Sequence, residues 1–444
     1  MTPHRDNYHA EVSAALRAAG VADVDDSALA RALYSSDASL YRVLPQAVAR
    51  PRHVEEIEAV LDVWRMLELQ ATRRGSGTSS AEKAVGPGVL LDTSRYRTRI
   101  LQVDPESSLA VVEPGVVQAQ LQAAARPLGL RFGPDPSTHN RCTIGGMVGN
   151  NACGSRALAY GRTSDNVLGL DILTGAGARL TLDNRAGPSP LTDGLLSSLK
   201  ELVAGNLATI RADLGRFGRQ VSGYSLEHLL PERGFDVARA LVGSEGTLAL
   251  VLGATVRLVP DPPLRCLVVL GFPTMADAAD ATPGLLIHAP TACEGLDSRI
   301  VDRVRQSSSA PVPDLPRGAG WLIVELAGDS QDELAHRASQ VAQTPVAVAT
   351  QPAPAPAPAA RTGPLPAAAI WLPARAVRRG DTSSPPPPPP TPPPPPPTPP
   401  PPSPTPATPP PPPPPSPPPP PVPHSPAATA PADPRPRTRP PHPP

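Results

Sequence analysis

The stretch FGPDPSTHNRCTIGGMVGNNACGS, residues 132–155, is the most informative part of this chain. Two prolines fix the backbone at its start, and the run Thr143–Gly146 predicts the first turn of a short helix. Gly145 and Gly146 have no Cβ, so the backbone there can lie against a bulky ligand. The first N–H groups of a helix have no partner within the helix and suit a diphosphate. The stretch therefore predicts a site that holds a nucleotide cofactor through backbone atoms.

The composition divides the chain into two unlike parts. Most of its 68 prolines lie in residues 351–444, and the preceding part has ordinary globular proportions. Proline blocks helix interiors and central strands, and a segment of proline and alanine has little apolar surface to bury. We therefore expect a disordered C-terminal segment, which follows a part long enough for one large or two medium domains.

Charge and cysteine content argue against several classes of protein. The chain has 40 lysines and arginines and 40 aspartates and glutamates, so it has no net positive charge that would favour the binding of nucleic acid. Its four cysteines show no Cys-x-x-Cys spacing, which disfavours a zinc ribbon or an iron–sulfur cluster. The N-terminus is polar, and no apolar run approaches the roughly 20 residues of a membrane span. We expect a cytoplasmic protein with no membrane span and no nucleic-acid partner.

The order of the predicted elements favours an α+β fold. Helices are expected over residues 8–34 (two short ones), 53–69, 116–126 and 191–214. Hairpins are expected at residues 99–113 and 167–182, and a long apolar strand at 248–259. From residue 265 to residue 343, strands and helices alternate, which indicates a second α+β module. This mixture favours α+β over a parallel doubly wound sheet.

A second candidate for ligand binding is the glycine-rich run from Arg74 to Ser79. An ordinary turn would have a similar composition. The run lacks the Gly-Lys-Ser/Thr ending of a phosphate-binding P-loop, and it is not Gly-x-Gly-x-x-Gly. Its successive N–H groups could instead form an anion nest, with hydroxyls as further donors. The presence of the 134–155 segment and of Gly243–Thr247 in the same chain favours the ligand-binding interpretation.

These motifs, in this order, resemble those of the vanillyl-alcohol oxidase / p-cresol methylhydroxylase (PCMH-type) flavoproteins. Within that family the resemblance is to the D-lactate, glycolate and 2-hydroxyglutarate dehydrogenase branch, and it covers roughly residues 30–343. It rests on the runs Arg74–Ser79, Ala84–Gly86, Leu91–Ser94, Val112–Gly115, Pro134–Ser155, Tyr160–Gly161, Asp165–Val167, Gly223–Leu226 and Leu241–Leu248. The family implies that FAD lies between two α+β subdomains, with its diphosphate at the first loop.

The resemblance also implies which residues contact FAD. In the first loop these are Arg74, Gly75, Ser76, Gly77, Thr78 and Ser79. In the long stretch they are Pro134, Ser137, Thr143, Ile144, Gly145, Gly146, Asn150, Gly154 and Ser155. Before the long strand they are Val242, Gly243, Glu245, Gly246 and Thr247. Relatives with covalently attached flavin often carry histidine where Thr78 stands, so we expect non-covalent FAD.

Some positions in these segments call for another interpretation. Relatives usually read Ala-Gly where this chain has Ala81-Glu82, and a carboxylate aimed at a diphosphate would repel it. We therefore expect Glu82 to face solvent. We interpret His139, Cys142 and Cys153 as structural residues rather than acid–base or redox groups.

The catalytic part of the family pattern is missing from this sequence. Relatives supply a base and a metal site from a His-rich run in the C-terminal half, and no such run follows here. We therefore assign no catalytic residue and no metal ligand. We expect an N-terminal helical segment (1–45), a PCMH-type FAD-binding domain (46–260), a partial substrate (cap) domain (261–343) and a disordered proline-rich tail (344–444). The abrupt change near residue 343 favours a truncated or frame-shifted product over a natural fusion.

The activity that the resemblance implies is FAD-dependent dehydrogenation of a small D-2-hydroxy acid, with an electron acceptor other than nicotinamide. Because the catalytic run is missing, we expect FAD binding with weak or no turnover. An alternative is a proline-rich interaction protein carrying a remnant flavin domain, whose tail binds polyproline-binding domains. A third interpretation, an NADPH-dependent reductase of the same flavin fold, is disfavoured by the residues at 134–155.

Overall fold

The computed structural model describes residues 8–183, 193–307, 312–344 and 370–373. The predicted proline-rich tail lies outside the described residues except at Thr344 and at 370–373. The described part combines three sheets with helices, and the predicted α+β class is confirmed.

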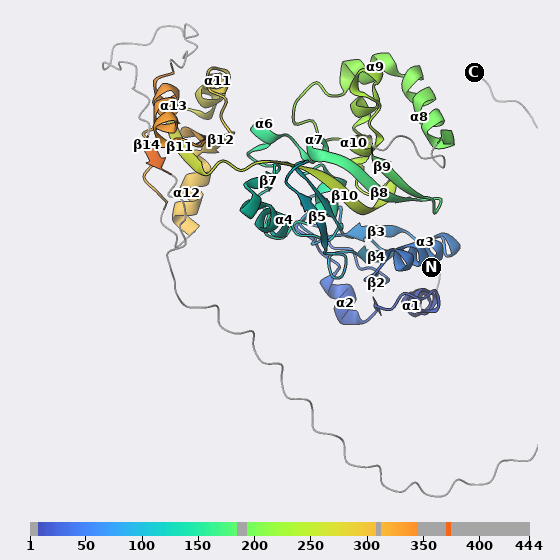
Figure 1. Cartoon of the computed structure of the whole chain (residues 1–444). Helices are drawn as coiled ribbons and strands as arrows, with labels where there is room; N and C mark the ends of the chain where they lie inside the picture. The colour runs from blue at the N-terminus through green and yellow to red at the C-terminus, as the bar shows by residue number, and fades with distance from the viewer. Residues whose placement is uncertain (1–7, 184–192, 308–311, 345–369, 374–444) are drawn as a thin grey trace, which may run out of the picture. The chain divides into compact units, whose positions relative to one another are not determined.

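The first sheet is mostly parallel and lies at the N-terminal, blue end of the chain (Figure 1). Its strands, in spatial order, are β1 (Val24–Asp25), β2 (Ala47–Ala49), β4 (Val89–Asp92) and β3 (Ala71–Arg74). Strands β2, β4 and β3 run parallel, and β1 pairs with β2 in the antiparallel sense. Helices α1 (Tyr8–Ala18), α2 (Ala28–Leu33) and α3 (Val54–Met66) accompany this sheet. The buried side of α3, with Ile57, Val60 and Trp64, packs with Leu91 of β4, as its apolar spacing predicts.

The second sheet is antiparallel and has β10 (Ala249–Pro260) at its centre. Its order is β5 (Ile100–Asp104), β6 (Leu109–Val112), β10, β8 (Val167–Thr174) and β9 (Arg179–Asp183). The short strand β7 (Leu130–Phe132) pairs with the end of β10. Both predicted hairpins are confirmed, because β5 pairs with β6 and β8 pairs with β9.

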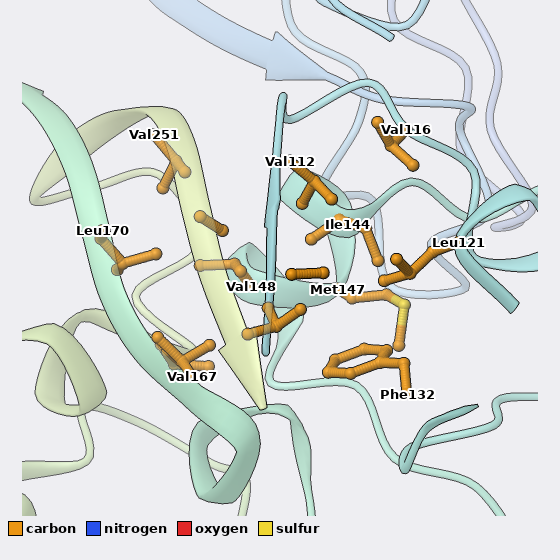
Figure 2. Close-up of a cluster of buried hydrophobic side chains, with 14 of the residues drawn as sticks. Val112, Val116, Leu121, Phe132, Ile144, Met147, Val148, Val167, Leu170 and Val251 are labelled. Carbon is orange, nitrogen blue, oxygen red and sulfur yellow. The ribbon is translucent and has the colours of Figure 1, made fainter. Parts of the chain in front are cut away.

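Helix α5 (Ile144–Asn150) is formed within residues 132–155, and it is anchored in the main hydrophobic core. Ile144, Met147 and Val148 are buried there with Phe132 of β7. Figure 2 shows the Met147 side chain pointing toward the ring of Phe132. The helix is therefore fixed by its buried side, which includes Gly145, whereas Gly146 is exposed.

Further helices belong to this part of the chain, and α8 and α9 among them pack in a separate hydrophobic cluster. They are α4 (Gln118–Ala125), α6 (Ala157–Tyr160), α7 (Thr163–Asn166), α8 (Asp193–Gly205), α9 (Leu207–Asp213) and α10 (Val237–Leu241), with 3₁₀ turns at Arg126–Leu128, Leu226–Leu229 and Pro231–Arg233. The single helical segment expected at 191–214 is two helices, separated at Asn206, because the glycine at the end of α8 favours termination.

The third sheet forms the second predicted module. Its order is β12 (Ala292–Asp297), β13 (Gly320–Gly328), β11 (Leu264–Phe272) and β14 (Ile370–Pro373), all antiparallel. Helices α11 (Met275–Leu286), α12 (Ser298–Ser307) and α13 (Gln331–Gln343) belong to the same module. Strand β14 falls in the range that the sequence assigned to the tail, at a short apolar run within proline-rich sequence.

Candidate FAD site

A cavity of about 270 Å³ lies where the three predicted cofactor segments meet. Strand β3 leads into one wall, α5 forms another, and the turn before β10 forms a third. The predicted site residues that line it are Gly75, Ser76, Gly77, Thr78, Ser79, Thr143, Gly145, Gly146, Asn150, Glu245 and Gly246. The structure therefore brings together eleven of the residues chosen from sequence, from segments far apart in the chain.

Two glycines of this cavity, Gly75 and Gly145, stand where a side chain would meet other protein atoms. A Cβ at Gly75 would lie 2.3 Å from Oγ1 of Thr143, so the first loop and the start of α5 touch at this point. A Cβ at Gly145 would lie 2.7 Å from Cβ and 2.8 Å from the carbonyl oxygen of Pro114. The two glycines thus allow the segments that form the cavity walls to pack closely against one another.

Thr143 holds the first turn of α5. Its Oγ1 accepts a hydrogen bond from the backbone N–H of Gly146 at 3.2 Å, and the residue is buried. This N-cap contact fixes the direction of the glycine backbone that lines the cavity.

We expect Thr143→Ala to lower the free energy of unfolding by about 1 kcal/mol, because the cap is lost. We also expect a several-fold weaker FAD affinity, because the first turn of α5 would loosen beside the cavity. Urea denaturation and FAD titration measure the two effects. Thr274→Ala is the matched control, since Thr274 caps α11 in the other module. It should reduce stability without changing FAD affinity, and equal FAD losses in both variants would contradict the prediction.

Arg73 is a charged residue of this cavity that was not among the site residues chosen from the sequence. Its Nη2 atom is buried and has no hydrogen-bond partner among the described residues. It lies 2.5 Å from the position of a Cβ at Gly145, beside the start of α5. Burial lowers the pKa of the Arg73 guanidinium to about 10, which leaves it charged at neutral pH. The cavity therefore contains a buried cation that forms no ion pair with any described residue.

Asn151 adds a second donor without a partner. It is 1% exposed, its Nδ2 lacks a hydrogen-bond partner within the described part of the chain, and it lines the same cavity. Its Oδ1 already accepts a hydrogen bond from the N–H of Ser164. Two unpaired donors and a run of glycine backbone match a ligand rich in acceptors, such as a dinucleotide diphosphate. The residues present therefore fit FAD.

Arg74 behaves differently from its neighbour. Its Nη1 donates to the carbonyl oxygens of Tyr34, Ser36 and Ala84 at 2.9 to 3.4 Å, and its guanidinium lies over the Tyr34 ring. Arg74 does not line the cavity. Its side chain supports the first loop from outside, so a role for Arg74 in FAD binding would be indirect.

Other predicted residues surround the cavity without lining it. These are Pro134, Ser137, Ile144, Gly154, Ser155, Val242, Gly243 and Thr247. Gly154 packs against the backbone of Asp135, where a Cβ would lie 2.1 Å from the carbonyl oxygen. The N–H of Gly243 donates to the carbonyl of Val148, and that of Glu245 donates to Gly149. These contacts shape the walls, and direct contact of the eight residues with FAD stays a prediction.

Lys83 connects two walls at the cavity. It forms an ion pair with Glu245 and donates to Oδ1 of Asn150 at 3.2 Å. The adjacent Glu82 has a backbone φ of 58°, a left-handed conformation that favours glycine, and it is half-buried without lining the cavity. The lysine thus neutralises the one carboxylate that lines this cavity within the described part of the chain.

We expect Lys83→Met to weaken FAD binding by roughly threefold to tenfold, because Glu245 would then face the diphosphate without its cation. The double variant Lys83→Met/Glu245→Gln should recover most of the affinity. Fluorescence titration with FAD measures both. A double variant as weak as the single one would show that the Glu245 charge is not the cause.

For Cys142, Cys153 and His139 the structural interpretation stays a prediction, and both cysteines line the cavity. Burial raises the pKa of the Cys142 thiol, so it stays protonated and packs in the core. Cys153 lines the cavity and its Sγ accepts a hydrogen bond from Nη2 of Arg219 at 3.4 Å. His139 lines a different cavity.

Comparison with known proteins identifies the family. A family model described as "FAD binding domain" matches residues 45–183, and one described as "FAD linked oxidases, C-terminal domain" matches residues 261–362. The chain belongs to the PCMH-type FAD flavoproteins. The second match extends beyond residue 343, where the sequence analysis placed the end of the cap domain. FAD is the cofactor that this family and the residues of the cavity both indicate.

Relatives of this flavoprotein include several 2-hydroxy-acid enzymes. It is 32% identical over 329 residues to D-2-hydroxyglutarate dehydrogenase of Escherichia coli (70% of this chain, 32% of the relative). It is 32% identical over 287 residues to glycolate oxidase subunit GlcD of Bacillus subtilis (64% and 52%). It is 30% identical over 306 residues to D-lactate dehydrogenase of Archaeoglobus fulgidus (68% and 59%). The flavoprotein thus spans between 32% and 59% of the length of these three relatives.

Solved structures share the fold of the flavoprotein. Alkyldihydroxyacetonephosphate synthase superposes with a TM-score of 0.54 at 17% identity, covering 77% of this chain and 60% of that one. A carbohydrate oxidase from Microdochium nivale gives 0.52 at 13% identity, with 82% and 62% covered. Among the described residues of the flavoprotein, no helix has both the length and the apolar character to cross a bilayer. The same residues contain no cluster of three or more histidine, cysteine, aspartate or glutamate side chains placed to hold a metal ion.

Proposed function

We propose that this chain is an FAD-dependent oxidoreductase of the D-2-hydroxy-acid dehydrogenase type. The observation that carries the proposal is a pair of donors, Arg73 Nη2 and Asn151 Nδ2, that have no partner among the described residues and belong to a cavity lined by several glycines. The names of the relatives support small 2-hydroxy acids as the substrate class. Bound FAD would supply an acceptor for the hydride that leaves the carbon bearing the hydroxyl.

The residues of the cavity divide this task among them. Backbone N–H groups of Gly75–Ser79 and the guanidinium of Arg73 would hold the diphosphate. The apolar wall, with Leu241, Ala249 and Val251, would exclude water from the cofactor. The proton of the substrate hydroxyl requires a base, for which we assign no residue. Weak or absent turnover therefore stays a prediction.

The test begins with FAD binding. Purified protein should be yellow or should bind FAD with a saturable change in flavin fluorescence, more tightly than riboflavin. Addition of D-lactate, glycolate or D-2-hydroxyglutarate without oxygen then shows whether the flavin is bleached. Rapid bleaching would contradict the expectation of weak turnover, and absence of FAD binding would contradict the proposal itself. Bleaching by NADPH alone would favour the reductase interpretation.

The interaction-protein alternative is tested separately. Deletion of residues 374–444 leaves all described residues in place. Loss of a binding partner with unchanged FAD content would assign the polyproline interaction to that segment. A cytoplasmic location is likewise a prediction, and fractionation of cells that express the chain would test it.

A further inference from the structure

A second cavity of about 270 Å³ lies beside α4 and β7 and shares no lining residue with the first. Four arginines line it: Arg126, Arg131, Arg156 and Arg265. The two carboxylates in the lining are Asp135 and Asp261, so the wall carries two more positive than negative charges. This excess of cations is the first sign that an anion binds here.

The carboxylates are already engaged with other arginines. Arg156 Nη1 lies 2.6 Å from Oδ2 of Asp135, and Arg265 pairs with Asp261. Arg131 is left with longer contacts, at 3.7 Å to Asp135 and 3.5 Å to Asp261. Arg156 also forms an ion pair with Glu325 of β13, which does not line the cavity. When Glu325 is included, the four arginines and three carboxylates have a net charge of one positive. Arg131 Nη1 donates a hydrogen bond to Oδ1 of Asp261 at that 3.5 Å distance, and the guanidinium lies over the Tyr160 ring, so Nε is the atom of Arg131 that has no partner among the described residues.

Two buried polar atoms in this wall lack partners within the described part of the chain. Arg131 is 6% exposed, and its Nε has no hydrogen-bond partner. Gln118 is 1% exposed, and its Oε1 has none, although its Nε2 donates to the carbonyl of Pro134. A buried polar group without a partner costs about 1–3 kcal/mol, so both atoms favour an occupant. The occupant must accept from a cation and also donate to an amide oxygen.

We propose that this cavity binds a small oxyanion that carries its own O–H group. A hydroxycarboxylate and a hydrogen phosphate share that chemistry. Water could satisfy the two unpaired atoms, but it would not supply an anion for Arg126, the exposed arginine of the lining that accounts for the one remaining positive charge. An oxyanion accepts from Arg131 and Arg126, and its O–H donates to Gln118.

The position of the cavity gives such an anion a structural consequence. Arg126 and Arg131 belong to the FAD-binding part of the chain, whereas Arg265 lies on β11 of the third sheet. Asp135 and His139, which also line the cavity, belong to the stretch that supplies α5. A bound anion would therefore stabilise the contact between the cofactor segment and the start of the cap module.

The test uses the full chain saturated with FAD, so that added anions do not occupy the diphosphate site. Calorimetric titrations with inorganic phosphate and with glycolate are compared. Saturable binding of either supports the proposal, and the tighter ligand identifies the source of the oxyanion. Absence of saturable binding for both, at concentrations up to about 10 mM, overturns it. If the protein does not bind FAD, the same anion titrations are made on the FAD-free protein. Failure of anion binding can therefore be told apart from failure of the proposed function.

A matched pair of variants tests whether the anion binds in this second cavity. Ala119 lines the cavity in the first turn of α4, where an aspartate suits the helix. Ala119→Asp should reduce anion affinity at least tenfold, because its carboxylate occupies the place of the anion. Ala119→Asn, of the same size but uncharged, should retain binding within about threefold. Equal binding by both variants would overturn the assignment to this cavity.

A second pair avoids the buried residues. Arg126 is exposed and forms no ion pair with any described residue, and Arg303 is an exposed arginine on α12. Arg126→Ala should weaken anion binding several-fold, whereas Arg303→Ala, with the same loss of charge, should not. Equal effects would indicate general charge attraction and contradict a built site.

Discussion

Gly145→Val is expected to reduce FAD affinity at least a hundredfold. The N–H of Gly145 donates to the carbonyl of Pro114 at 2.7 Å, which holds the start of α5 close to that proline. Because a Cβ at residue 145 would already lie 2.7 and 2.8 Å from Pro114 atoms, a larger side chain must break this contact or move α5. Either change displaces the backbone that faces the diphosphate. Flavin fluorescence titration measures the loss.

The control for this variant is Gly194→Val in α8. A Cβ at Gly194 meets nothing within 4 Å, and the residue is exposed. Valine is also a better helix former than glycine, so stability should not fall. Circular dichroism of Gly145→Val should show a folded protein, since one loop contact changes. Wild-type FAD affinity in folded Gly145→Val would contradict the role assigned to this backbone.

Arg73→Met is expected to change stability and FAD affinity in opposite directions. Without FAD, the variant should be more stable by about 1–2 kcal/mol, because a buried donor without a partner has been removed. With FAD, the affinity should fall about tenfold to a hundredfold, because hydrogen bonds to charged groups contribute about 1.5–3 kcal/mol. Urea denaturation of the FAD-free protein measures the change in stability, and FAD titration measures the change in affinity.

The neighbouring arginine provides the control. Arg74→Met removes donors to three carbonyl groups, so the FAD-free protein should become less stable. Riboflavin adds a further test, because it lacks the diphosphate and its affinity should be the same for wild type and Arg73→Met. An FAD-free Arg73→Met protein that is less stable than wild type would show that Arg73 is structurally satisfied.

The comparison of Arg73 with Arg74 also shows what the sequence could and could not predict. Glycine positions are readable because the missing side chain is itself the signal, and the cavity is lined by Gly75, Gly145 and Gly146 as expected. The direction of an arginine side chain depends on strand register. Arg73 and Arg74 end the short strand β3, and successive residues of a strand point to opposite faces. The sequence pattern predicts no strand at these residues, so the motif indicates Arg74 and gives no sign of Arg73.

The second cavity illustrates another limit. Gln118, Arg131, Arg156 and Arg265 come from four separate elements, and none belongs to a motif with fixed spacing. Their meeting depends on the pairing of β7 with β10 and on the course of the chain into β11. Local helices and hairpins were predicted because their periodicity is local. Contacts that depend on tertiary packing left no pattern in the sequence.

The cofactor cavity is lined by residues far apart in the sequence, from Arg73 to Val251. Val251 belongs to β10, the last strand of the second sheet along the chain. The walls of the cavity can meet only after the intervening segments have been synthesised and β10 has paired with its neighbours on both sides. Native contacts between distant residues form slowly, so newly made chains would pass through a period without a cofactor pocket. Since FAD binds the folded state, riboflavin supply during growth should influence how much of the protein accumulates.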